Sequence, residues 1–531
     1  MNERLVEDWL NKASERAYQI PFAQSLIAEG MQVLRVGHSP HEHGKDIIAI
    51  DKKGKVHAYQ LKDGNLTLTG FQEAFGQINA LVETPVEHPA ITGKPPHKPW
   101  LVISGDVTNP AEDRIRVQNE GWKKRRLPSL SVMVGKQLLV KFINMAQGFW
   151  PDKPEDSRSL LSLYLAEGRG CLDRKAFSKL IRGVVTPTAK TPKTKVRLSL
   201  AAANLFASYA LSPFYTVGNH WELVQGWTIT AAHIAWAAEK AKLKNEDWVQ
   251  TFRLAVESAL TALDALALEA LTPNALGPST FNEIDELTRA RCTICAGVIS
   301  VKVLLERWKK SCWEVEPVAK KTIEDLFKNG RFFLWGESAV PFFLAIVWAL
   351  DKLRADQFSD LILLSILSSV AHRNRRGETL KLNSPYDSAD EVAAKLLRHL
   401  FEKEKFLERQ SAASYTLDPL VTLVAGRLWR NRLAAAWGEI AQIDSIQIIA
   451  DKPRDMFLWD WGHERGSHQS RRLGAPQSWR KLLAESRQAE DEVLPATFKA
   501  HFDFKLLFLL CYPHRLSRPL VKHLEETIRT L

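Results

Sequence analysis

The stretch Gly44-Lys45-Asp46-Ile47-Ile48-Ala49-Ile50, followed by Tyr59-Gln60-Leu61-Lys62, decides the fold of the first part of this chain. Between the two segments lies Asp51-Lys52-Lys53-Gly54, a polar loop that ends in glycine and is typical of a β-hairpin. The residues on both sides of this loop are largely β-branched or aromatic, which favours extended strands. The sequence therefore predicts two neighbouring antiparallel strands here.

Three polar side chains are expected at one end of this hairpin. Side chains alternate across a strand, so Gln60 and Lys62 point to one face and Leu61 points to the other. Asp46 opens the neighbouring strand, which lets its carboxylate approach the amide and the ammonium group. Such a group of side chains can hold a divalent metal and a water molecule beside a phosphate.

At these residues the sequence resembles the Mrr-like PD-(D/E)xK restriction endonuclease family, in the variant where Gln replaces the usual acidic residue. Asp46 with Gln60-x-Lys62 carries the resemblance. The expected order of elements agrees with it: a helix ending at residue 30, strands at 32–36, 44–50 and 59–62, a helix over 69–82 and a strand at 100–104. The resemblance covers residues 1–150 and implies a restriction-endonuclease-like α/β domain, in which helices flank a mixed sheet.

The resemblance also implies roles for the residues of the hairpin. Asp46, the side-chain oxygen of Gln60 and the main-chain carbonyl of Leu61 would bind Mg²⁺, with Mn²⁺ as a substitute. Lys62 would orient or help to deprotonate the attacking water and offset the charge that develops on the phosphate. The implied reaction is hydrolysis of a DNA phosphodiester bond.

The first helix of this family usually supplies a glutamate that helps to bind the metal. Counting back from Gly30, Gln19 occupies that place, and Glu15 lies one turn earlier as the alternative. Gln19 could equally cap the helix that Pro21 begins. Because proline interrupts helical hydrogen bonding, the segment is expected to form either a kinked helix or two short helices.

Basic residues near this domain are candidates for contacts with phosphates. Lys45 directly precedes Asp46, and a basic run follows a predicted helix; the run consists of Lys123, Lys124, Arg125 and Arg126. The run is interpreted either as a solvated surface or as a set of phosphate contacts that read no bases. A loop with three histidines, at 38, 41 and 43, is either a polar loop or a zinc site.

Composition places limits on the remaining 380 or so residues. The chain has 531 residues, 45% hydrophobic and 25% charged, which is ordinary for a globular protein of two or more domains. Its net charge of +11 suits a polyanionic partner. Five cysteines are too few for a disulfide framework, no secretory signal is visible, and no apolar run reaches the length of a membrane span. These features predict a cytoplasmic protein that does not enter a membrane.

Beyond residue 150 the apolar residues recur at helical spacing, which predicts a large all-α domain over residues 151–531. A polar, proline-containing segment at 184–197 could subdivide it. Arginines at 427–432 and in the Trp- and His-rich stretch that follows could bind phosphates and stack on bases, or pack helices together, or bind a partner protein.

Taken together, these features predict a Mg²⁺-dependent DNA endonuclease that acts in restriction or anti-phage defence. The helical domain would control its activity by assembling a homo-oligomer, or by binding a partner protein such as an NTPase or a sensor. The alternative is a catalytically weak or inactive nuclease-fold subunit that binds DNA or serves as a scaffold. The missing helix glutamate and the Gln at position 60 favour this alternative, whereas the presence of both Asp46 and Lys62 argues against it.

Overall fold

The computed structural model divides into two compact units, Met1–Thr261 and Ala262–Leu531, which are described separately. It describes residues 2–36, 44–88, 90–93, 95–147, 149, 154–187, 191–273, 275–276, 285–311, 313–374, 385–392, 412–458, 466–473, 478–487 and 494–531. The three histidines at 38, 41 and 43 lie outside these residues.

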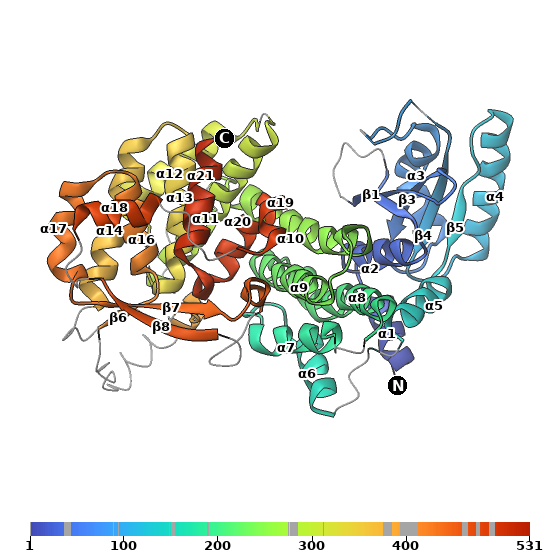
Figure 1. Ribbon diagram of the computed structural model, residues 1–531. Coiled ribbons are helices and arrows are strands. Elements are labelled where there is room, and N and C mark those ends of the chain that lie inside the picture. Colours follow the sequence, from blue (N-terminus) through green and yellow to red (C-terminus); the bar gives the residue numbers. More distant parts are fainter. Residues whose placement is uncertain are drawn as a thin grey trace. The chain divides into compact units, whose positions relative to one another are not determined.

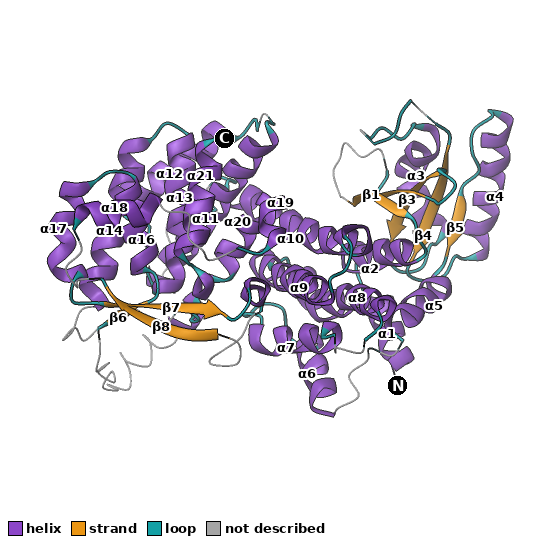
Figure 2. Ribbon diagram, in the orientation of Figure 1, coloured by secondary structure: helices purple, strands orange, loops and turns teal. Residues whose placement is uncertain are grey.

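The first unit contains a mixed five-stranded sheet (Figures 1 and 2). Its strands, in spatial and chain order, are β1 (Gln32–Val36), β2 (Ile47–Ile50), β3 (Val56–Lys62), β4 (His97–Ile103) and β5 (Ser131–Met133). The first three strands pair antiparallel, whereas β3, β4 and β5 run parallel. The predicted hairpin is β2–β3, so the mixed sheet of the prediction is confirmed.

Five helices accompany this sheet: α1 (Asn2–Lys12), α2 (Glu15–Ala28), α3 (Leu68–Glu83), α4 (Asn109–Lys124) and α5 (Gly135–Ala146). The first helical segment breaks at residues 13–14, and Pro21 lies inside α2. The helix is thus continuous through the proline, and neither helix begins there. The Thr67 hydroxyl caps α3 by accepting a hydrogen bond from the Gly70 N–H.

The two faces of the sheet pack against different helices. On one face, buried residues of the sheet such as Ile48 and Leu101 pack with Phe71 of α3 and Trp122 of α4 in a single apolar cluster. On the other face, Tyr59 of β3 packs edge-on against Phe22 of α2, with ring centroids 5.2 Å apart. This alternation places Ala58 and Tyr59 on opposite faces, as the period of a strand requires.

The same compact unit continues into a helical layer after residue 150. Its helices are α6 (Pro154–Tyr164), α7 (Arg174–Val185), α8 (Lys193–Val217), α9 (His220–Ala241) and α10 (Val249–Ala270), the last of which crosses the division between the two units. Helix α8 packs on α2 and α5, and it also packs on α7. The segment 184–197 therefore joins two helices of one unit. The last strand of the sheet ends at Met133 and α5 ends at Ala146, and the compact unit continues beyond both.

Helix α2 is buried on every side. Ten consecutive residues, from Ala17 to Leu26, are buried, because the sheet covers one side of the helix and α8 covers another. Its one deeply buried amide in the last turns is satisfied from the helical layer: Asn204 Nδ2 donates to Gln24 Oε1 (3.0 Å), and Gln24 Nε2 donates to Thr251 Oγ1 (3.2 Å). The sheet and the helical layer are therefore joined through α2.

We expect residues 1–150 to be unable to fold alone. Without α8, one whole side of α2 would face water, and the apolar burial that stabilises it would be lost. A fragment covering residues 1–273, which retains the helices through α10, should melt cooperatively. The fragment 1–150 should aggregate or show no cooperative transition by circular dichroism and calorimetry. A cooperative, monomeric 1–150 fragment would contradict this interpretation of α2.

The second unit is mainly helical but contains a three-stranded sheet. Its helices are α11 (Asp285–Lys309), α12 (Glu316–Lys328), α13 (Val340–Lys352), α14 (Asp356–Asn374), α16 (Leu417–Gly426), α17 (Arg430–Ile440), α18 (Trp479–Arg487), α19 (Ala496–Ala500), α20 (Phe502–Cys511) and α21 (Arg518–Arg529). Strand β7 (Asp444–Ala450) lies between β6 (Ala413–Ser414) and β8 (Gly466–Arg472).

The all-helical prediction for residues 151–531 is therefore wrong at this sheet. Strand β7 carried a signal for it: Ile446 and Ile448 alternate with polar residues at a period of two. Strand β8 carried almost none, because its sequence, Gly-Ser-His-Gln-Ser-Arg-Arg, lacks β-branched residues.

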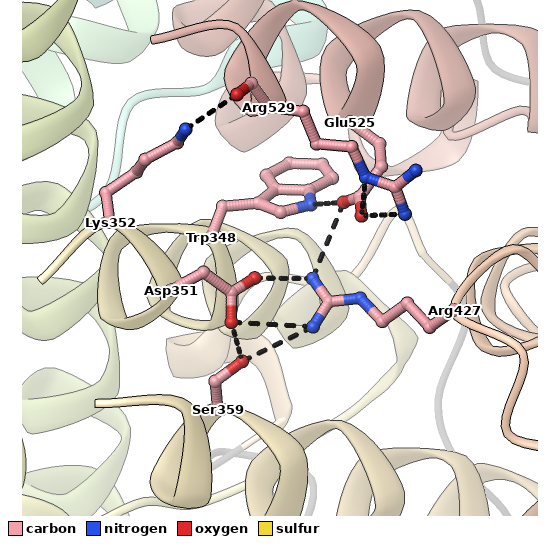
Figure 3. A network of polar contacts seen from close by, with 7 residues as sticks. All are labelled: Trp348, Asp351, Lys352, Ser359, Arg427, Glu525 and Arg529. Carbon is pink, nitrogen blue, oxygen red and sulfur yellow. Dashed lines mark hydrogen bonds and ion pairs between the residues drawn. The ribbon is translucent and has the colours of Figure 1, made fainter. Parts of the chain in front are cut away.

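The guanidinium of Arg427 joins four helices of this unit (Figure 3). Its Nη2 lies 2.6 Å from Asp351 Oδ2 on α13 and 3.5 Å from Glu525 Oε2 on α21. Ser359 of α14 bonds to the same aspartate, and Trp348 donates its indole N–H to the same glutamate. The sequence left three roles open for the arginine-rich region: phosphate binding, helix packing and partner binding. Arg427 takes part in helix packing.

Replacing Arg427 by Met should destabilise the second unit by about 3 kcal/mol, because the buried carboxylate of Glu525 and the partly exposed carboxylate of Asp351 would lose their shared cation. Arg432 offers a matched control, since it contacts Asp360 at 3.5 Å and its side chain is 49% exposed. The Arg432→Met variant should lose less than about 1 kcal/mol. Chemical denaturation of the full chain measures both, and equal losses in the two variants would contradict a structural role of the Arg427 network.

Candidate active site

The hairpin brings Asp46 and Gln60 into direct contact. The Asp46 N–H donates to the Tyr59 carbonyl (2.8 Å), which sets Asp46 beside the end of β3. Asp46 Oδ2 then accepts hydrogen bonds from Gln60 Nε2 (2.9 Å) and from the Leu61 N–H (2.6 Å). The predicted approach of these two side chains is confirmed, and both are buried, with exposed fractions of 5% and 3%.

A glycine is required immediately before this site. Gly44 has φ +72°, a conformation that side chains rarely adopt. A Cβ atom there would lie 2.3 Å from the Gln77 carbonyl of α3 and 3.2 Å from Gln60 Oε1. The backbone at Gly44 therefore lets α3 and the Gln60 amide pack closely behind Asp46.

The residues present fit a divalent cation. Gln60 Nε2 lies 2.9 Å from Asp46 Oδ2 and 3.5 Å from the Leu61 carbonyl, so the three predicted ligands converge on one place. Gln60 Oε1 is buried and accepts no hydrogen bond. Turning the amide over would bring Oε1 next to the two other oxygens, an arrangement that a cation between them would stabilise.

Lys62 is held by the first turn of α2. Its ammonium lies 2.9 Å from Glu15 Oε1, and both side chains are about a quarter exposed, at 21% and 24%. One turn further along α2, the Tyr18 hydroxyl donates to the Lys62 carbonyl at 2.8 Å. Helix α2 therefore positions both the side chain and the main chain of Lys62.

Of the two candidates on α2, it is Glu15 that brings a carboxylate to the site. Gln19 Nε2 donates to the main-chain oxygen of Asp46 (3.3 Å), so Gln19 supports the strand. Glu15 and Gln19 are four residues apart and share one face of the helix, which is why counting along the sequence could not separate them. Burial raises the pKa of Glu15 above its usual value, and the hydrogen bond from Lys62 opposes this shift.

Lys45 lies in a position different from the one expected for a phosphate contact. Its side chain is buried, and its ammonium lies 3.4 Å from the Ala80 carbonyl in the last turn of α3. Burial lowers the pKa of Lys45 to about 8. Because side chains alternate, Lys45 and Asp46 point in different directions, and Lys45 faces α3.

The basic run lies at the far end of α4. All four residues are exposed, and Arg125 forms an ion pair with Glu83 at the end of α3 (2.6 Å). The other end of α4 is bonded near the end of β3, through the Thr108 N–H and the Leu66 carbonyl. Sixteen helical residues span about 24 Å, so the run lies well away from Lys62. Contacts of the run with phosphates stay a prediction.

Comparison with protein-family models, with curated proteins and with solved structures gave no match. Within the described residues, no group of three or more His, Cys, Asp or Glu side chains is arranged to hold a metal, so a cation at the hairpin would be held by the Asp46 carboxylate together with amide and carbonyl oxygens. None of the helices that the structure describes has both the length and the apolar character needed to cross a bilayer.

The pH dependence of stability tests the environment of Glu15. A carboxyl group whose native pKa is raised contributes its full stability below the usual value of 4.5 and loses it as pH rises through the native pKa. Relative to Glu15→Gln, the wild type should therefore lose stability as pH increases from 4.5 towards neutrality.

Lys62→Met provides the comparison, because it removes the cation that opposes the shift. Its stability should fall more steeply with pH than that of the wild type. Urea denaturation of the three proteins from about pH 4 to about pH 8 measures both effects, because this range begins near the usual pKa of a glutamate carboxyl group. If the stability of the wild type relative to Glu15→Gln rises with pH, the assignment is wrong.

Proposed function

We propose that the first unit is a Mg²⁺-dependent endodeoxyribonuclease of the Mrr-like PD-(D/E)xK type. The observation that supports this most strongly is the convergence of Asp46, Gln60 and the Leu61 carbonyl, with the buried Gln60 Oε1 accepting no hydrogen bond. A buried acceptor without a donor costs about 1–3 kcal/mol, so a site that keeps one is a candidate for binding a cation.

The proposed role of each residue follows from its contacts. Asp46, Gln60 and Leu61 would hold Mg²⁺ or Mn²⁺. When bound, the ion would polarise the phosphate and lower the pKa of a water molecule. Lys62, about a fifth exposed, can donate to that water or to a phosphate oxygen. Glu15 fixes the direction of the Lys62 ammonium and can accept a proton from the same water.

The wider role proposed is that of a restriction or anti-phage defence effector that cuts DNA. Its activity would be controlled by the helical part of the chain through assembly as a homo-oligomer, or through a partner protein such as an NTPase or a sensor. The net charge of +11 supports a DNA substrate. The packing of α2 against α8 supports control by the helical layer, because any movement of α8 would act on the helix that holds Lys62.

A second candidate function is a DNA-binding or scaffold subunit without catalysis. Two observations favour it: Asp46 is the only carboxylate that contacts Gln60 in the contacts described, and Lys62 is engaged in an ion pair with Glu15. A neutral amide binds Mg²⁺ more weakly than a carboxylate does. In this candidate function the pair Lys62–Glu15 would only stabilise the junction of α2 with β3.

Cleavage of supercoiled and linear plasmid DNA by the full chain, with Mg²⁺ and with Mn²⁺, separates the two functions. Nicking or linearisation by the wild type is expected. Asp46→Asn and Lys62→Ala should reduce the rate by at least about 100-fold, because each removes a group acting on the reacting atoms. Lys12→Ala is the control, since Lys12 is an exposed lysine that contacts only Asp8 among the described ion pairs, and it should leave cleavage unchanged.

Replacing Gln60 by Glu adds the acidic residue that the family usually carries. It should raise the affinity for Mg²⁺, measured by calorimetry, because a carboxylate is the stronger ligand for this ion. Absence of both metal binding and cleavage in the wild type and in Gln60→Glu would contradict the nuclease proposal and favour the scaffold function.

A further inference from the structure

A groove of about 590 Å³ lies between helix α4 and the edge strand β5. Val107, Ile115 and Val132 give it an apolar floor. Asn119 closes the floor by bonding the Leu130 backbone twice, at 3.1 Å through its Nδ2 and at 2.8 Å through its Oδ1. The α4 residues that line the groove extend from Glu112 to Lys123, so the groove follows the helix, which runs beside β5 in Figure 1.

The α4 wall of this groove carries charges of alternating sign. In chain order they are Glu112, Arg116, Glu120 and Lys123, all of which are exposed. At 100° per residue they stay within about 80° of one another around the helix, so they form one stripe. Alternating charge is common on a solvated helix.

The stripe is complementary to itself. If a second copy of α4 lies antiparallel against the first, with a two-fold axis near residue 118, Glu112 faces Lys123 of the second copy. In the same arrangement Arg116 faces Glu120 of the second copy and would exchange its exposed ion pair with Asp113 of its own helix (3.1 Å) for that contact. The two-fold axis repeats both pairs. A two-fold interface requires such self-complementarity of one patch.

We propose that the α4 groove is the interface between two copies of this chain. The two α4 helices meet antiparallel, the apolar floor of each groove is covered, and four ion pairs form across the axis. Strand β5, the last strand of the sheet that the structure describes, is shielded at its outer edge by the same contact. This inference does not rest on the nuclease proposal, because none of its residues belongs to the candidate active site.

Charge reversal in the full chain tests the interface. Multi-angle light scattering and sedimentation at micromolar concentrations should give the wild type a mass of twice the 60.0 kDa of one chain. Arg116→Glu and Glu120→Arg should each raise the dissociation constant more than about tenfold, since each places like charges opposite one another twice. Arg114→Glu, on the opposite side of α4, is the control and should remain dimeric.

Mixing the two reversed variants is the decisive step. The negative charge introduced at position 116 of one variant would face the positive charge introduced at position 120 of the other, and the unchanged Arg116 and Glu120 would face each other. An equimolar mixture should therefore form a heterodimer although each variant alone is monomeric. Pairing within one helix cannot produce that result. The proposal is overturned if the wild type is monomeric, if the single reversals remain dimeric, or if the mixture stays monomeric while circular dichroism shows both variants folded.

Discussion

The burial of helix α2 on all sides is the constraint on which the first unit depends. One side of the helix packs on the sheet through contacts such as Phe22 with Tyr59, and α8 packs on another side. A helix in this position has no polar face to give to solvent, so its buried polar groups need partners inside the protein. Gln24 finds them in Asn204 and Thr251, which belong to the helical layer.

The same helix also positions the residues of the candidate active site. Glu15, Tyr18 and Gln19 come from its first turns, and each contacts the hairpin that carries Asp46 and Lys62. A shift of α2 by a fraction of a side-chain length would change all three contacts together. For this reason the helical layer is part of the support of the site, although none of its residues contacts the hairpin in the contacts described here.

Among the described residues, the polar cluster around Arg427 and the one at the hairpin differ in their contacts. Around Arg427, each carboxylate accepts hydrogen bonds from several donors, and the cluster joins helices. At the hairpin, Gln60 Oε1 is buried without a donor, and Lys62, two residues further along β3, remains partly exposed. Arg427 Nε is also buried without an acceptor, so an unsatisfied atom alone does not mark a binding place; at the hairpin it coincides with the convergence of Asp46, Gln60 and the Leu61 carbonyl.

Local patterns in the sequence predicted the sheet well and the environment of its side chains less well. The hairpin, the strand at Gln32–Val36 and helix α3 followed from alternation, turn residues and apolar spacing. The burial of Lys45 and the pairing of Glu15 with Lys62 depend on where α2 and α3 pack, which no local pattern encodes. The sheet of the second unit was missed because β8 is polar throughout.

The burial of α2 on all sides could not be predicted from local sequence patterns, because its partner α8 is far away in the chain. The hydrogen bond between Gln24 and Asn204 joins residues 180 positions apart.

Native-state hydrogen exchange of the full chain tests most directly the claim that α2 and α8 depend on each other. The account predicts that the amides of Ala17–Leu26 and those of α8 exchange through one common opening, with equal free energies under conditions where exchange is limited by that opening. Exchange of α8 at a clearly lower free energy, with α2 still protected, would contradict it.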